Sequence, residues 1–306
     1  MPLQYHAGQL EVQDEANTRK VAANLSRWVG PVTEFATTAD LILLASMSGE
    51  GVLTFTTLSG AAPLVEIAGP GAVRFPLLRP SQPEAWTGGL TISLEHAQRA
   101  RLNGCLRSAD GGAILEAREA FTNCRKYVVP SLALAADPFV GPSCREDIDL
   151  DDPWLVATIA SARTAFLASQ SPEGRPDISH RGGEAGFLHL DSAARRLTWQ
   201  EYVGDGMFKS AGNIRATPIA TLLVIEIATG DAAELSGTAR YETLRTMKQT
   251  RLDALQQHRD SFPVQGAMTL EVTRVRRLRS VIQPRRLLEG AQGVTSSSPI
   301  EEQAPQ

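Results

Sequence analysis

Two short polar stretches in the second half of the chain contain residue types that bind a phosphate-bearing aromatic ligand. The residues concerned are Ser179, His180, Arg181, Lys209, Ser210 and Asn213. Arginine can bind phosphate through two parallel hydrogen bonds, whereas lysine acts as a point charge. Glycines follow the first stretch and precede the second, and glycine lets backbone approach a ligand closely. The two stretches therefore predict one anion-binding site.

Neighbouring side chains could line the flat ring of such a ligand. Glu201 and Tyr202 end an apolar run, and Met207 and Phe208 come directly before Lys209. If a helix starts near residue 209, its first N–H groups would point at the anion. We therefore predict that these four residues surround the ring while the cations hold the phosphate.

Each of these residues also has an ordinary structural interpretation. His180 could be a surface residue or support a neighbour, and Arg181 could form a surface ion pair of little energetic value. Ser210 and Asn213 could merely cap a helix. The aromatic residues could belong to the core. The residues alone leave these alternatives open, and they identify no catalytic side chain.

Other arrangements that carry chemistry are weaker. The chain has no GxGxxG, phosphate-loop or HExxH pattern. His180 and His189 could lie on adjacent strands, but no third ligand is evident, so we predict no metal site. Two cations follow Cys124 and could lower the pKa of its thiol, although a buried structural cysteine is the alternative.

Composition limits the class of protein. The 306 residues are 42% apolar and 21% charged, which is typical of a globular protein with room for two domains. A net charge of −4 argues against nucleic acid as a partner. No apolar run approaches the roughly 18–20 residues of a membrane span, and no signal peptide is evident. The three cysteines form no CxxC pair, so we expect a cytoplasmic protein.

Short apolar runs separated by glycine and proline turns continue from residue 41 to 120 and start again at residue 164. This pattern is typical of a β-sandwich or barrel. Residues 130–152 contain several prolines and an acidic run, and are a candidate boundary. Asp152 followed by Pro153 predicts the start of a helix that extends to about residue 163.

Three further elements are predicted near the ends of the chain. An amphipathic helix over residues 14–28 would stop at Gly30 and Pro31, and good helix formers occupy residues 244–259. A strand over residues 267–275 runs into arginines between 274 and 286. Those arginines could bind an anionic partner or form a solvated strand face.

The two halves of the chain have matching segments. The sequence "LILLASMSGEG" in the first half parallels "TAFLASQSPEG" in the second, and "RARLNGCLRS" parallels "AAELSGTARY". We interpret this recurrence as two copies of one barrel in tandem. The first copy has no counterpart of "SHRGG" or "MFKSAGNI".

Residues 166–226 resemble the pyridoxamine 5′-phosphate oxidase-related, FMN-binding split-barrel family. The matching segments are "FLASQSPEGRPDISHRGG", "GFLHLD" and "YVGDGMFKSAGNIRATPIATLLVIE". The resemblance implies a mainly β fold of two tandem six-stranded antiparallel Greek-key split barrels with peripheral helices. The expected domains are a degenerate N-terminal barrel at 1–145, an FMN-binding barrel at 146–289 and a disordered tail at 290–306.

The same resemblance implies a function. The family's phosphate and ring contacts fall on Ser179, His180, Arg181, Met207, Phe208, Lys209, Ser210 and Asn213. FMN would lie near a barrel interface, where the first barrel supplies the wall that a partner subunit supplies in single-barrel relatives. The implied activity is hydride or electron transfer through flavin N5 on an unknown small substrate, with NAD(P)H as a candidate donor. A homodimer is plausible, because twofold pairs are the commonest oligomers.

Three alternatives stay open at this point. The chain could bind flavin without turnover, as a passive or redox-sensing module. It could be a haem-binding member of the same barrel superfamily, with His180 or His189 as the candidate ligand. It could also use a deazaflavin. The C-terminal arginines do not match the substrate-binding pattern of a true pyridoxamine 5′-phosphate oxidase.

Overall fold

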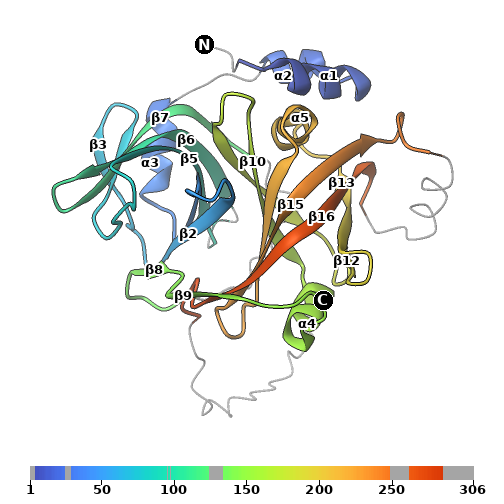
Figure 1. Ribbon diagram of the computed structural model, residues 1–306. Coiled ribbons are helices and arrows are strands. Elements are labelled where there is room, and N and C mark those ends of the chain that lie inside the picture. The colour runs from blue at the N-terminus through green and yellow to red at the C-terminus, as the bar shows by residue number, and fades with distance from the viewer. Residues whose placement is uncertain are drawn as a thin grey trace, which may run out of the picture.

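The computed structural model describes residues 4–24, 29–94, 96, 98–123, 134–248 and 262–284. Two curled antiparallel sheets lie side by side, with helices at their periphery (Figure 1). The predicted mainly β class is therefore confirmed. The predicted tail at 290–306, Cys124 and most of the predicted helix at 244–259 lie outside the described residues.

The elements follow the predicted series of short strands. The first half contains α1 (Ala7–Glu15), α2 (Arg19–Asn24), α3 (Val29–Ala36), β1 (Leu41–Met47), β2 (Leu53–Ser59), β3 (Glu66–Gly69), β4 (Ala72–Phe75), β5 (Glu84–Ser93), β6 (Gln98–Ala109) and β7 (Gly112–Thr122). The connecting segment adds β8 (Phe139–Gly141) and β9 (Cys144–Asp147). The second half contains α4 (Pro153–Ser161), β10 (Thr164–Gln170), β11 (Pro176–Gly182), β12 (Leu188–Asp191), β13 (Arg196–Tyr202), α5 (Lys209–Ala216), β14 (Ile219–Ile225), β15 (Ala232–Thr243) and β16 (Val264–Arg279).

The strand order is the same in both sheets. The first runs β3-β4-β7-β6-β5-β1-β2, and the second runs β12-β13-β16-β15-β14-β10-β11. Even the irregularities coincide, because a register shift follows Asn103 in β6 and Ser236 in β15. Glycine comes next in both strands, where an added Cβ would lie within 2.0 Å of a carbonyl oxygen of the facing strand. These features confirm the tandem copies that the sequence predicted.

Each sheet has eight strands among the described residues, rather than the six expected. The connecting segment explains part of the difference, because β8 pairs with β2 and β9 pairs with β16. The boundary that the sequence marked by its prolines and acidic residues therefore adds one strand to each sheet.

The acidic and basic runs meet in this added strand. Arg274 of β16 pairs with Asp147 at 2.8 Å, and Arg279 pairs with Glu146 at 3.0 Å. Arg274 and Arg279 therefore form largely exposed ion pairs with the connecting segment. The sequence had left open an anionic partner or a solvated strand face for these arginines.

The helices confirm one prediction and correct three. Asp152 caps α4 by accepting from the N–H groups of Trp154 and Leu155, as predicted. In contrast, no helix ends at residues 30 and 31 as predicted. Helix α3 starts at Val29 and continues through both residues. Proline is tolerated in a first turn because its missing N–H would have no partner there. Residues 244–247 form a turn, not the start of the predicted helix.

The predicted single helix over residues 14–28 is also corrected. Helix α1 already ends at Glu15, and α2 starts at Arg19. Between them Asn17 has a left-handed φ of 56°, a conformation that asparagine tolerates better than most residues and that interrupts a helix.

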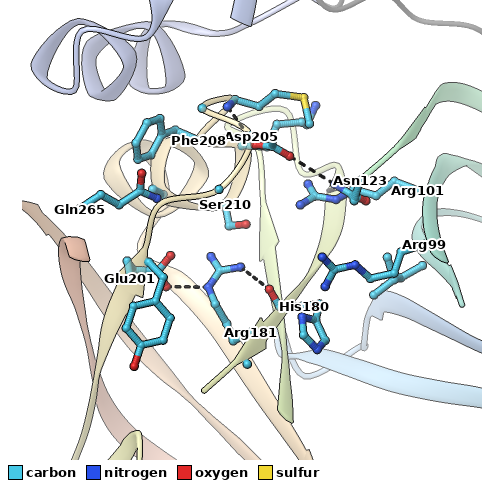
Figure 2. Close-up of a pocket in the computed structure, with 18 of the residues that line it drawn as sticks. Arg99, Arg101, Asn123, His180, Arg181, Glu201, Asp205, Phe208, Ser210 and Gln265 are labelled. Atoms are coloured by element: carbon cyan, nitrogen blue, oxygen red, sulfur yellow. Dashed lines mark hydrogen bonds and ion pairs between the residues drawn. The ribbon is translucent and has the colours of Figure 1, made fainter. Parts of the chain in front are cut away.

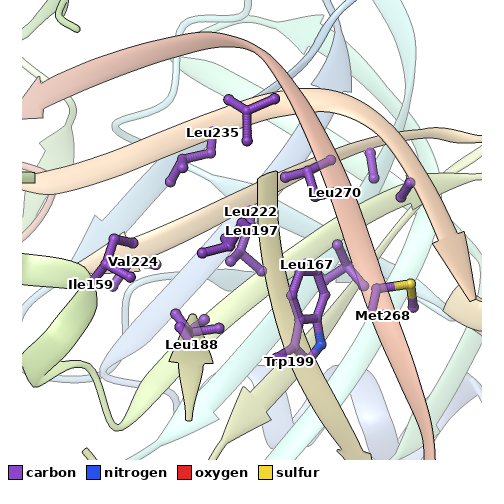
Figure 3. Packing of buried hydrophobic residues seen from close by; sticks show 14 of the residues in the cluster. Ile159, Leu167, Leu188, Leu197, Trp199, Leu222, Val224, Leu235, Met268 and Leu270 are labelled. Atoms are coloured by element: carbon purple, nitrogen blue, oxygen red, sulfur yellow. The ribbon is translucent and has the colours of Figure 1, made fainter. Parts of the chain in front are cut away.

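Apolar side chains fill each barrel and the space between the two. Figure 3 shows the core of the second half, where Trp199 packs with Leu167, Leu197, Met268 and Leu270. A further cluster combines residues from both halves, including Phe55 and Leu90 with Phe166, Ile178 and Leu223. The halves are therefore joined by a buried apolar interface. Among the described residues, no helix has the length and apolarity to cross a membrane.

Candidate functional site

A pocket lies where β11, β13 and the start of α5 face β5 and β6 of the first half (Figure 2). Its volume is about 120 Å³. Most of the predicted site residues line it, namely His180, Arg181, Glu201, Tyr202, Met207, Phe208, Lys209 and Ser210. Folding thus brings the two predicted stretches together from opposite ends of the second sheet.

Arg181 is held in a buried ion pair. Its Nε donates to Glu201 Oε1 at 2.6 Å, and Nη1 donates to the His180 carbonyl at 3.0 Å. Trp199 Nε1 donates to the same Glu201 oxygen at 2.7 Å. The Arg181 and Glu201 side chains are only 15% and 8% exposed, so this is not the surface pair of the ordinary interpretation. A guanidinium has five N–H donors, which leaves donors for a ligand.

Lys209 starts α5 and reaches toward the first half. Its Nζ lies 2.7 Å from Glu119 Oε2 on β7, and its side chain is 5% exposed. The ammonium also lies 5.9 Å from the centre of the Phe121 ring. The lysine therefore links the two halves, and its charge is already partnered.

Two of the predicted residues do not line the pocket. Ser179 is buried beneath it, with its hydroxyl 2.5 Å from that of Ser210, and so fixes the start of α5. Asn213 donates to Ser169 Oγ at 3.1 Å and accepts from Gln9 Nε2 at 2.9 Å. Asn213 therefore faces α1, and it neither caps α5 nor contacts the pocket.

The residue before α5 has a left-handed backbone conformation, and the start of α5 lines the pocket. Phe208, at the N-cap position, has φ +52°, a conformation that costs energy outside glycine and is often found at functional sites. Asp205 accepts from the N–H of Met207 at 3.0 Å and stabilises the preceding turn. No acidic side chain occupies the first turn of α5, so its positive end faces the pocket without a neutralising neighbour in that turn.

His180 lies in the pocket as a neutral imidazole. Burial lowers the pKa of His180 well below its usual value, and the charges of Arg99 and Arg181 act in the same direction. Its ring meets Phe166 edge-on, with the ring centres 5.7 Å apart. His189 lies exposed on β12 and does not line this pocket.

The first half contributes residues that the sequence reasoning missed. Arg99, Arg101 and Asn123 line the same pocket (Figure 2). Arg101 Nη1 lies 2.8 Å from Asp177 Oδ2 of β11, with both side chains buried. One signal was available, because arginines at positions i and i+2 of a strand point to the same face. This spacing did not show that the face of β6 carrying the two arginines lies against β11 of the second half.

The lining residues include more basic than acidic side chains, and two of the cations, Arg101 and Lys209, pair with the carboxylates of Asp177 and Glu119 outside the lining. Arg99, Arg101, Arg181 and Lys209 line the pocket, against Glu201 and Asp205. The volume of about 120 Å³ is below the roughly 300–1,000 Å³ of pockets that enclose a whole small ligand. The pocket therefore suits one anionic end of a ligand, and the remainder would lie outside it or require side chains to move.

The described residues include two free cysteines, of which Cys144 is exposed and Cys105 is partly buried. No group of three or more histidine, cysteine, aspartate or glutamate side chains in this described part of the chain could hold a metal ion. Burial raises the pKa of the Cys105 thiol to about 11, and its hydrogen bond to Glu84 adds to the shift. Cys105 is therefore a poor nucleophile.

Comparison with known proteins gives matches to solved structures. The HupZ protein of Group A Streptococcus is 19% identical, covering 41% of this chain and 98% of its own, with a TM-score of 0.33. A pyridoxamine 5′-phosphate oxidase-related, FMN-binding protein of Nostoc punctiforme is 16% identical, covering 42% and 85%, with a TM-score of 0.32. An FAD-binding protein of Mycobacterium smegmatis is 10% identical, covering 44% and 98%, with a TM-score of 0.31.

The chain resembles solved pyridoxamine 5′-phosphate oxidase-related structures. General stress protein 26 of Bacillus anthracis and a protein of Clostridium acetobutylicum related to general stress protein 26 match to a similar extent. No protein-family model matches the chain, and no curated protein matches it.

Proposed function

We propose that the chain is a flavoprotein that binds FMN in the pocket between its two halves. One observation carries the proposal: basic side chains from both halves and the amino end of α5 meet around a single small cavity. A dianionic phosphate suits such donors, because hydrogen bonds between charged groups are roughly twice as strong as neutral ones.

Two buried polar atoms of residues that line the pocket also favour a ligand. Arg101 Nε and Asn123 Oδ1 are buried and have no hydrogen-bond partner within the described ranges. A buried polar atom without a partner costs roughly 1–3 kcal/mol, and a bound polar group would remove that cost. The residues present therefore fit a ligand that offers both an acceptor and a donor.

In this proposal each residue has a defined role. Arg181 and the first N–H groups of α5 hold the phosphate, and Lys209 joins them if its ion pair with Glu119 opens. Tyr202 and Phe208 lie beside the ring, and Glu201 orients Arg181. A bound flavin supplies hydride or electron transfer through N5. The chain contributes binding, orientation and exclusion of water.

Titration with three flavins tests the proposal. FMN should bind more tightly than riboflavin, which lacks the phosphate, and FAD belongs in the comparison because its phosphate is substituted. Replacing both cations, by Arg181→Ala with Lys209→Ala, should abolish the preference for FMN, since each charge-assisted bond contributes about 1.5–3 kcal/mol. Binding is followed by flavin fluorescence and folding by circular dichroism.

A matched control is Arg240→Gln, because Arg240 is exposed and outside the pocket. It should bind all three flavins as the unaltered chain does. Equal affinity for FMN and riboflavin in the unaltered chain, or no affinity for either, would reject the phosphate assignment. A haem band in the absorption spectrum would instead support the haem alternative, for which His180 is the residue in the pocket.

We extend the proposal to an oxidoreductase that accepts electrons from NAD(P)H. Anaerobic bleaching of the flavin bands by NADH or NADPH would support turnover, whereas unchanged bands would favour a passive or redox-sensing module. The substrate is proposed only as a small molecule. The homodimer stays a prediction, and the pocket itself is completed by the two halves of one chain.

A further inference from the structure

A second cavity lies in the first half, at the place that α5 occupies in the second half. The shared strand order and register give many strand residues a counterpart in the other copy. The first hairpin ends with Met47 opposite Leu53, and the equivalent hairpin ends with Gln170 opposite Pro176. By this register Ser46 corresponds to Ser169, and Thr56 corresponds to Ser179.

The residues beneath α5 show what the first half lacks. Ser169 accepts from Asn213 of α5 at 3.1 Å, and the Ser179 hydroxyl is 2.5 Å from that of Ser210. Their counterparts line the second cavity. Only residues 76–83 connect β4 to β5, whereas residues 203–218 connect β13 to β14. The shorter connection leaves open the space that α5 fills in the other copy.

The size and walls of this cavity suit a small ligand with an apolar body. Its volume is about 610 Å³, within the roughly 300–1,000 Å³ of small-molecule pockets. Leu44, Leu77, Leu106 and Val140 supply apolar walls. It shares no lining residue with the proposed flavin pocket, so the two sites are independent.

The charges around the cavity favour an anion. Its lining includes Arg79, Arg145, Arg276 and, as an acid, Glu50, which pairs at 2.6 Å with Arg274 outside the lining. Arg276 is matched by Glu234 through two hydrogen bonds.

Arg145 and Arg79 are the lining cations without an ion pair among the described residues. Arg145 lies on the exposed strand β9, and its Nη2 donates to the Phe55 carbonyl at 2.7 Å. Burial lowers the pKa of the Arg145 guanidinium. The carboxylate of Glu234, which already pairs with Arg276, opposes that shift, and the charge of Arg276 adds to it. An acid group bound at Arg145 would supply the counter-charge.

We infer that this cavity binds a small organic acid, with its anionic group at Arg145 and its apolar body against Leu44 and Leu106. The inference does not depend on flavin binding. Isothermal titration calorimetry with decanoate, decanol and decyltrimethylammonium tests it, because these probes share one apolar chain and differ in charge. Decanoate should bind at one site per chain, more tightly than decanol, and the cation should not bind.

Two variants locate the bound probe. Arg145→Gln keeps a donor for the Phe55 carbonyl but removes the charge, and should weaken decanoate binding roughly tenfold or more while leaving decanol unaffected. Thr56→Phe places a phenyl ring in the cavity and should weaken the binding of both. The matched controls Arg240→Gln and Thr198→Phe alter a charge and a strand residue outside both pockets, and should bind as the unaltered chain does.

Three results would overturn the inference. The first is that no probe binds the unaltered chain. The second is that decanol binds as tightly as decanoate, which would leave an apolar cavity with no role for Arg145. The third is that folded Thr56→Phe binds decanoate normally, which would place the probe elsewhere. Flavin titration of the same variants should give unchanged affinities, so failure here is distinguishable from failure of the flavin proposal.

Discussion

The surroundings of His180 decide its protonation state. Its ring lies against Phe166, and the neighbouring guanidinium groups of Arg99 and Arg181 oppose a further positive charge. A neutral imidazole can accept a hydrogen bond from a ligand in the pocket without adding to the net charge. The same burial that positions the ring therefore also makes folding sensitive to pH.

His180→Gln should reduce the loss of stability on acidification. The pKa of His180 is lowered in the folded chain, whereas in the unfolded chain it is about 6.5. Below that pH the unfolded state binds a proton that the folded state does not, so stability falls as the pH drops. Urea unfolding between pH 8 and pH 5 should show a shallower decline for the variant.

At pH 8 the histidine is neutral in the unfolded chain as well. The difference in the free energy of unfolding between the variant and the unaltered chain at this pH therefore measures lost packing alone. Parallel stability curves for the two proteins across this range would contradict the assignment of a lowered pKa to His180.

Helix α1 packs against α5, the helix whose first residues line the pocket. It lies beside α5 at one end of the two sheets (Figure 1), and Gly8 and Gly212 allow the two helices to touch. Gln13 donates to the Met207 carbonyl at 2.9 Å, and Thr18 donates to the Gly206 carbonyl at 2.9 Å. The N-terminal segment therefore fixes the loop before α5.

Gly212→Ala should loosen this contact. An added Cβ would lie 2.3 Å from Gln9 Cα, which is backbone and can yield only if α1 moves. We expect a loss of about 1–3 kcal/mol in the free energy of unfolding, reduced by the better helix propensity of alanine. Hydrogen exchange should show faster exchange in α1 and in the loop at residues 203–208.

Gly49→Ala is the matched control, because an added Cβ there meets no atom within 4 Å. Unaltered protection of α1 in folded Gly212→Ala would show that the close approach of the two helices is not needed for docking.

The two halves contact one another through equivalent strands. Strand β11 lies against β1 and β5, and β2 lies against β10 and β14. Arg101 reaches Asp177 in one direction, and its counterpart Glu234 accepts from the Phe55 N–H at 3.1 Å in the other. One chain thus forms an interface like that between two subunits, and the two halves should unfold together.

Arg101→Met should destabilise the whole molecule. It leaves the Asp177 carboxylate buried with Asn103 as its remaining side-chain partner, and breaking a buried ion pair costs roughly 3–5 kcal/mol. Denaturant unfolding measures the loss. Adding Asp177→Leu should recover much of it, because the unpaired charge is then removed.

Arg196→Met is the control, since Arg196 and Glu271 form an exposed pair in the second sheet and little change is expected. A loss for Arg101→Met no larger than for this control would contradict a stabilising role for the pair between the halves.

The sequence predicted local features well. Turn residues and β-rich runs located the strands, and Asp152 with Pro153 located α4, because these signals depend on neighbours in the chain. The prediction for residues 30 and 31 was wrong, since proline is compatible with both the end of one helix and the first turn of the next. The cofactor-binding assignment of Asn213 stays a prediction, although the structure turns its side chain toward α1.

The sequence by itself determined the repeat, the strand series and most side chains of the candidate pocket, because these follow from residue type and short spacing. Only the tertiary structure decided that Arg99 and Arg101 complete that pocket, and that the first copy has an open cavity in place of α5. Both depend on how two distant segments pack, and the contacts of a buried surface are set by the whole fold and not by local sequence.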